Sequence, residues 1–156
     1  MIHEPATLIL IEDTPDDEQL ALRALRQLGV PLMVKVARDG EAGVKLLGLD
    51  DANADGPVPD LVLCDLKLPK LSGDEILRRA RASERLKDVP FVIFSSSDET
   101  SDIDRCKALG ATDYVPKPVD YELYQESVRE ITTSHLRKGP TFCVLPEENG
   151  VQRRPK

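Results

Sequence analysis

A regular alternation of short apolar runs with longer amphipathic segments constrains the fold of this chain more than any other feature. Most of the short runs are continuous and aliphatic, which is typical of strands that are buried on both faces of a sheet. They predict five strands, at Thr7–Ile11, Met33–Ala37, Leu61–Cys64, Pro90–Phe94 and Asp113–Val115.

The segments between these runs carry the signals of helix starts and ends. Pro15 stands at a first helical position with acidic residues behind it, and Gly29 follows the last apolar residue of the same segment. Helices are predicted at 15–28, 39–49, 74–85, 100–109 and 120–136, and a surface loop at 50–59. Strands that alternate with such helices form βαβ units. We therefore expect an α/β fold with a doubly wound, five-stranded parallel sheet.

Composition and charge narrow the classes of partner. The chain has 156 residues, which is enough for one domain, and a net charge of -7. Such a chain lacks the basic faces that neutralise nucleic-acid phosphates or anionic lipid, so we expect neither partner. No apolar run approaches the roughly 20 residues of a membrane helix, and residues 1–5 lack a secretory signal pattern. Cys64, Cys106 and Cys143 show no CxxC spacing, which favours free thiols in the cytoplasm.

Polar residues stand at the carboxyl ends of four of the predicted strands. Glu12 and Asp13 follow the first strand, Asp65 the third, Ser95 the fourth and Lys117 the fifth. In an open parallel sheet, the functional site lies beyond the carboxyl ends of the strands. Each residue alone would be unremarkable, but the set predicts one shared site at this edge of the sheet.

The chemistry of this set points to a metal and a phosphoryl group. Three carboxylates at one edge repel one another unless a cation joins them, and oxygen ligands with room for water suit Mg²⁺. A carboxylate oxygen of Asp65 can then attack a phosphoryl group and form an acyl phosphate. Lys117 would supply counter-charge to the phosphoryl oxygens, and Ser95 a hydroxyl hydrogen bond.

Three segments carry a resemblance to a known family. Leu10–Asp17, Pro59–Pro69 together with Gly73, and Gly110–Pro118 resemble the receiver domain of two-component response regulators. The resemblance covers about residues 5 to 136 and implies the flavodoxin-like receiver fold with strand order 2-1-3-4-5. We therefore predict a receiver domain at residues 1–136 and a C-terminal extension at 137–156.

The resemblance also implies a metal site. Asp65 would be the phosphoacceptor, and Asp13 would bind Mg²⁺ directly. Glu12 would act on the metal through water, and Lys67 would ligate it with its backbone carbonyl. The protein would catalyse only its own phosphorylation and dephosphorylation.

The family's switch and partners carry over in the same way. Ser95 and Lys117 would contact the phosphoryl group, and Tyr114 would be the aromatic residue that moves together with Ser95. The phosphoryl donor would be a sensor histidine kinase. The output of this phosphorelay signalling would pass through contacts with another protein or through dimerisation.

A closer resemblance rests on shorter segments. Leu86–Pro90, Asp102-Ile103 and the tail near Leu145-Pro146 are similar to phytochrome-associated response regulators. Those stand-alone receivers pair with a photoreceptor histidine kinase, and they form homodimers partly through C-terminal extensions. In this chain the extension at 137–156 has two interpretations, a disordered terminus or an arm whose apolar stretch Phe142–Leu145 packs on a partner.

Lys67 bears on both the lifetime of the phosphoryl group and a rival function. It stands two residues after Asp65, where its side chain could shield an acyl phosphate from water, so we hypothesise a long-lived phosphorylated form. A phosphatase of the dehalogenase type needs a general acid at this position, which lysine does not provide.

A flavin-binding protein of similar architecture is disfavoured because Glu12 and Asp13 would repel a flavin phosphate. The remaining alternative is a degenerate receiver that acts only as an interaction or dimerisation module.

Overall fold

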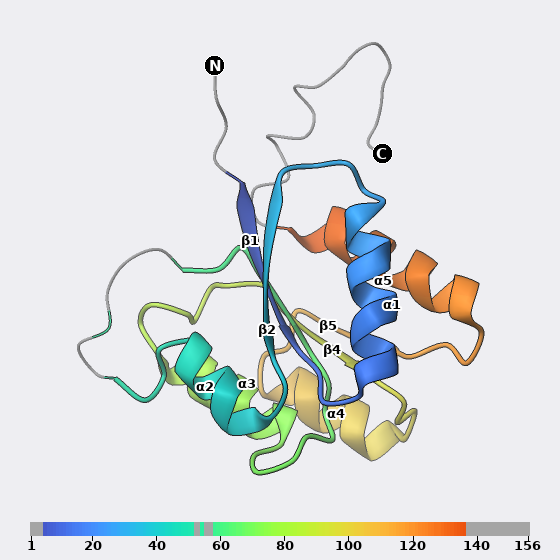
Figure 1. Cartoon of the computed structure of the whole chain (residues 1–156). Coiled ribbons are helices and arrows are strands. Elements are labelled where there is room, and N and C mark those ends of the chain that lie inside the picture. Colours follow the sequence, from blue (N-terminus) through green and yellow to red (C-terminus); the bar gives the residue numbers. More distant parts are fainter. Residues whose placement is uncertain (1–4, 52–53, 55–57, 137–156) are drawn as a thin grey trace.

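The sheet has the predicted architecture. The computed structural model describes residues 5–51, 54 and 58–136, and in this part of the chain it contains a five-stranded parallel sheet of order β2-β1-β3-β4-β5 (Figure 1). The strands are β1 (Ala6–Ile11), β2 (Leu32–Ala37), β3 (Leu61–Cys64), β4 (Phe91–Ser95) and β5 (Asp113–Pro116). The doubly wound fold and its strand order are therefore confirmed. Both interpretations of the extension at 137–156 lie outside the described residues, as does part of the predicted loop at 50–59.

Five helices connect and follow the strands in the described part of the chain. They are α1 (Pro15–Arg26), α2 (Gly40–Leu46), α3 (Gly73–Ala82), α4 (Thr100–Ala108) and α5 (Tyr121–His135). The start of α1 at Pro15 is confirmed, and the left-handed conformation of Gly29 (φ 67°) lies just beyond its end. The helix predicted to reach Arg85 ends earlier, because Ser83 is extended (φ -92°, ψ 129°) and the residues after it form hydrogen-bonded turns.

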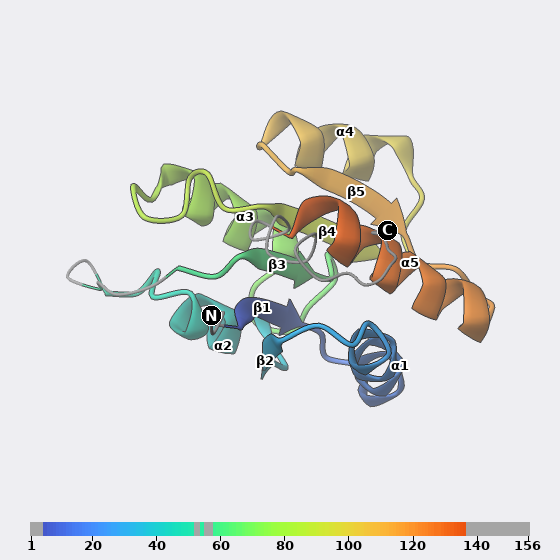
Figure 2. The ribbon, with the colours of Figure 1, turned by 90° about the horizontal axis from the view of Figure 1, so that it is seen from above.

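The helices cover both faces of the sheet. Figure 2 shows α1 and α5 on one side of the strands and α2 and α3 on the other. Within β1, Leu8 and Leu10 pack in the cluster that includes α1 and α5, whereas Ile9 and Ile11 pack in the cluster that includes α2 and α3. Successive side chains point to opposite faces, and both faces are covered, so the strand is apolar at every position except Thr7.

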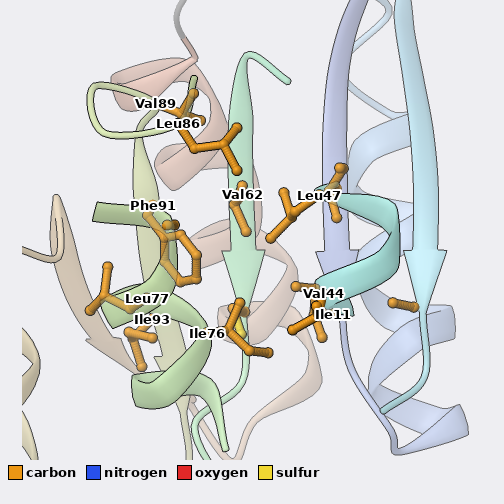
Figure 3. Close-up of a cluster of buried hydrophobic side chains, with 14 of the residues drawn as sticks. Ile11, Val44, Leu47, Val62, Ile76, Leu77, Leu86, Val89, Phe91 and Ile93 are labelled. Atoms are coloured by element: carbon orange, nitrogen blue, oxygen red, sulfur yellow. The ribbon is translucent and has the colours of Figure 1, made fainter. Parts of the chain in front are cut away.

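The core between the sheet, α2 and α3 is mainly aliphatic. In Figure 3, Leu47, directly after α2, and Ile76 and Leu77 of α3 lie against Val62 of β3 and Phe91 of β4. All five side chains are at most 1% exposed. This packing fixes where α3 begins relative to the end of β3. No helix in the described part of the chain is long and apolar enough to cross a membrane.

The register brings the strand ends together at one edge. Ile11, the last residue of β1, is paired with Ala37 of β2 and Cys64 of β3, and Cys64 is paired with Ile93 of β4. β2, which carries none of the candidate residues, lies at the margin of the sheet as expected. The residues that follow β1 and β3 therefore leave the sheet as neighbours, and so do those that follow β4 and β5, because Ser95 is paired with Pro116.

Candidate functional site

The three predicted carboxylates lie together beyond the ends of β1 and β3. One oxygen atom from each of Glu12, Asp13 and Asp65 lies within 4.8 Å of the others. Glu12 and Asp65 are buried, whereas Asp13 is partly exposed. Oxygen ligands on a rim that still reaches solvent match the preference of Mg²⁺ for carboxylates and retained water. The donor set therefore fits this metal.

Lys117 binds to this acidic cluster through its ammonium group. Its Nζ donates hydrogen bonds to Glu12 Oε1 at 2.8 Å, Asp17 Oδ2 at 2.8 Å and Asp65 Oδ2 at 3.0 Å. The Lys117 side chain is only 7% exposed. One buried cation thus joins carboxylates from the ends of β1 and β3 and from the first turn of α1.

Asp17 is the member of this cluster that sequence reasoning missed. In the sequence it belongs to the acidic first turn expected at any helix start, where carboxylates interact favourably with the helix dipole. Its contact with Lys117 joins residues 100 positions apart. The backbone carbonyl of Asp17 also accepts a hydrogen bond from the hydroxyl of Tyr124 on α5, at 3.2 Å.

Burial and the charge of the ion-pair partner act in opposite directions on the pKa values of Glu12 and Lys117. Burial, together with the nearby charge of Asp65, raises the pKa of Glu12 to about 7, although the Lys117 ammonium acts to lower it. Burial alone would lower the pKa of Lys117, but the carboxylates of Asp65, Asp17 and Glu12 outweigh it and raise that pKa. Lys117 therefore stays protonated at neutral pH.

The backbone after β3 holds the other oxygen of Asp65. The amide of Leu66 donates a hydrogen bond to Asp65 Oδ1 at 2.7 Å, and the amide of Gly73 donates to the Leu66 carbonyl at 2.8 Å. A Cβ atom on Gly73 would lie 2.2 Å from the Asp65 carbonyl oxygen and 3.0 Å from the Leu66 Cα. Only glycine allows the start of α3 to pack this closely against the backbone of Asp65.

Replacing Gly73 by Ala is therefore expected to destabilise the protein by about 1–3 kcal/mol, the usual cost of overpacking a close contact. Urea unfolding of both forms measures this loss. Gly29→Ala is the matched control, because Gly29 has a positive φ but no atom within 4 Å of an added Cβ. That control should lose only about 1 kcal/mol, from the left-handed backbone. Equal losses in the two variants would contradict the steric explanation.

Ser95 and Tyr114 lie on the neighbouring strands β4 and β5. Ser95 is fully buried, and its Oγ accepts a hydrogen bond from the Ser97 amide at 3.2 Å. Tyr114 is also buried, and its hydroxyl donates to the Ser97 carbonyl at 2.8 Å. Ser97 thus connects the two predicted switch residues. Their joint movement on phosphorylation stays a prediction.

Lys67 lies in the loop after β3, and its side chain is 68% exposed. Its Nζ is 3.9 Å from Asp102 Oδ2 at the start of α4. Both its predicted role as a backbone metal ligand and its proposed shielding of the acyl phosphate stay predictions. Local sequence patterns do not indicate the contact with Asp102, because the two residues are brought together only by the packing of α4.

Comparison with known proteins identifies one family. The sequence model of the response regulator receiver domain matches residues 8–129. The probable methanogenesis regulatory protein FilR2 of Methanothrix harundinacea is 33% identical over 128 residues, which cover 82% of each chain.

Two solved structures share the fold closely. The phosphorylated cyanobacterial phytochrome response regulator RcpA is 30% identical, with a TM-score of 0.78, and the match covers 84% of this chain and 94% of that one. The Mn²⁺-bound form of Rcp1, a response regulator of Synechocystis, is 27% identical, with a TM-score of 0.77 and coverage of 85% and 95%.

Proposed function

Because the chain belongs to the response regulator receiver family, we propose that it accepts a phosphoryl group on Asp65 from a sensor histidine kinase. The observation that carries this proposal is the contact between Asp65 Oδ2 and the buried ammonium of Lys117, beside the carboxylates of Glu12 and Asp13. A nucleophilic carboxylate next to a fixed cation is the arrangement that phosphoryl transfer requires.

In the proposed step, a carboxylate oxygen of Asp65 forms a bond to the phosphorus atom of a phosphohistidine. The bond between phosphorus and the histidine nitrogen breaks, and its electron pair stays with the imidazole. The product on the receiver is an acyl phosphate. Leu66 orients the carboxylate through its amide, and Lys117 balances the negative charge of the phosphoryl oxygens.

A divalent cation completes the proposed site. Glu12, Asp13 and Asp65 would hold Mg²⁺, and the family resemblance adds the backbone carbonyl of Lys67. When bound, Mg²⁺ neutralises negative charge on the phosphoryl oxygens. The relative Rcp1 has been solved in a Mn²⁺-bound form, which supports a divalent cation at an acidic site of this kind.

The output would follow from a shift between two conformations that already exist. Attraction of Ser95 and Lys117 to the phosphoryl group would move the loop after β4, which Ser97 connects to Tyr114. An exposed apolar set lies close to Lys117 in the chain and offers a surface for a protein partner; it comprises Val119, Tyr121 and Leu123.

The proposed partners are protein molecules in the cytoplasm. Similarity to RcpA supports a phytochrome kinase as the phosphoryl donor, and the phytochrome-associated resemblance supports a homodimer. Sedimentation of the phosphorylated and unphosphorylated forms would test the dimer. We propose no nucleic-acid or membrane partner for this acidic chain.

Mg²⁺ dependence tests the proposed chemistry directly. Intact mass spectrometry after incubation with acetyl phosphate should show the gain of one phosphoryl group in the presence of Mg²⁺. Removal of the metal with EDTA should reduce this gain to background, because the carboxylates would then repel the incoming phosphoryl group. Restoring excess Mg²⁺ should restore it. Equal labelling with and without metal would refute the proposed role of the acidic cluster.

A further inference from the structure

A buried carboxylate at the start of α4 connects two of the loops that border the site. Asp102 is 5% exposed. Its Oδ2 accepts a hydrogen bond from the Ser97 hydroxyl at 2.6 Å, and its Oδ1 accepts one from Arg105 Nη2 at 2.9 Å. The Lys67 ammonium lies 3.9 Å from the same Oδ2. Asp102 therefore contacts the loop after β3 through Lys67 and the loop after β4 through Ser97.

The charge of Asp102 is only partly balanced by its nearest arginine. Arg105 also donates from Nε to Asp74 of α3 at 3.0 Å, so its guanidinium is shared between two carboxylates. The hydrogen bonds from Ser97 and Arg105 lower the pKa of Asp102, which keeps it ionised at neutral pH. An ionised carboxylate with a shared partner continues to attract the ammonium of Lys67.

Lys67 connects this carboxylate to the phosphoacceptor through its contact with Asp102 and its place in the chain. It follows Asp65 by two positions and carries its charge on a flexible, largely exposed side chain. A phosphoryl group on Asp65 would provide a second negative charge within the same loop. The time that the ammonium spends near the phosphoryl oxygens then depends on how strongly Asp102 holds it.

We propose that Asp102 is a positioning residue that draws the Lys67 ammonium toward α4 and so shortens the lifetime of the phosphoryl group on Asp65. This inference rests on the proposed function, because it concerns the acyl phosphate. Without the charge on Asp102, the ammonium turns to the phosphoryl oxygens and shields them from water. The phosphorylated form then persists longer.

The test is a double-mutant cycle on the rate of dephosphorylation, with the variants Asp102→Asn, Lys67→Gln and both together. Asp102→Asn removes the charge but keeps an oxygen that accepts from Ser97. It should slow dephosphorylation by about twofold to fivefold, the effect of a partly exposed ion pair. The same substitution should have no effect in the Lys67→Gln background. Asp104→Asn is the matched control, because Asp104 is exposed on the same helix, and it should leave the rate unchanged.

Other outcomes overturn the inference. An unchanged or faster rate of dephosphorylation in Asp102→Asn would contradict it. Equal slowing in the wild-type and Lys67→Gln backgrounds would also contradict it, because Asp102 would then act through its hydrogen bond with Ser97. Thermal unfolding of each variant confirms that the fold is retained.

A second readout needs no phosphoryl transfer. Acylation of Lys67 by an amine-specific reagent, followed by peptide mass spectrometry, should be faster in Asp102→Asn than in the wild type and unchanged in Asp104→Asn. Equal acylation in all three would show that Asp102 does not hold the ammonium. If the wild type took up no phosphoryl group while acylation still changed, the proposed function would fail and the contact between Asp102 and Lys67 would stand.

Discussion

Asp65→Asn should abolish phosphoryl uptake from acetyl phosphate, to the detection limit of intact mass spectrometry. The amide that replaces the carboxylate has no charged oxygen to attack phosphorus. The fold should survive, because Lys117 keeps its hydrogen bonds to Glu12 and Asp17 and the Leu66 amide can still donate to the side-chain oxygen of Asn. The variant thus separates the chemistry of the site from its structure.

Two controls make this result specific. Asp104→Asn makes the same chemical change at an exposed position and should be labelled like the wild type. Circular dichroism and thermal unfolding should show a folded Asp65→Asn protein. Labelling of that variant at the wild-type level would mean that another residue accepts the phosphoryl group, and the assignment of Asp65 would be wrong.

Lys117→Met should destabilise the metal-free protein by about 3–5 kcal/mol, the usual cost of removing one partner from a buried ion pair. The ammonium joins Glu12, Asp17 and Asp65, and its own side chain is 7% exposed. Methionine has a similar length but no charge, so the carboxylates would face one another without a cation. Urea unfolding in EDTA measures the loss. Lys107→Met on the exposed side of α4 should cost less than about 0.5 kcal/mol.

Added Mg²⁺ should reverse part of this loss. In the wild type the ammonium and the metal compete electrostatically for the same carboxylates. Without the ammonium, the site is more negative and should bind Mg²⁺ more tightly, which stabilises the folded state by mass action. Isothermal titration should therefore show a lower Kd in Lys117→Met, while phosphoryl uptake falls. A higher Kd would contradict this account of the cluster.

The same cluster predicts a pH dependence of the metal-free wild type. The pKa of Glu12 is raised in the folded protein to about 7, above its ordinary value of 4.5, so the folded state binds a proton that the unfolded state has released. The Glu12 contribution to stability is therefore complete below about pH 4.5 and is lost as the pH rises toward about 7. Lys117→Met removes a group that lowers this pKa, so its deficit should be smaller at pH 6 than at pH 8.

The strands and the edge of the sheet that bears the site could be predicted from local patterns. Burial of both faces of the sheet made β1 and β3 nearly continuous apolar runs, and Asp65 follows directly after such a run. In a parallel sheet the ends of neighbouring strands meet, so Glu12, Asp65 and Lys117 were expected together before any distance was known. The resemblance to the receiver family, which the same motifs carry, is confirmed.

The partners of these side chains depended on how the helices pack. Asp17 is an ordinary first-turn acid in the sequence, and only the packing of α1 against α5, the helix that follows Lys117, makes it a partner of Lys117. Asp102 likewise becomes a partner of Lys67 only because α4 packs beside the loop after β3. The sequence by itself determined the strands, the order of the elements and the charged residues at the strand ends, because these follow from short-range periodicity. The tertiary structure alone decided which charges pair, because pairing depends on distances of a few ångströms between elements far apart in the chain.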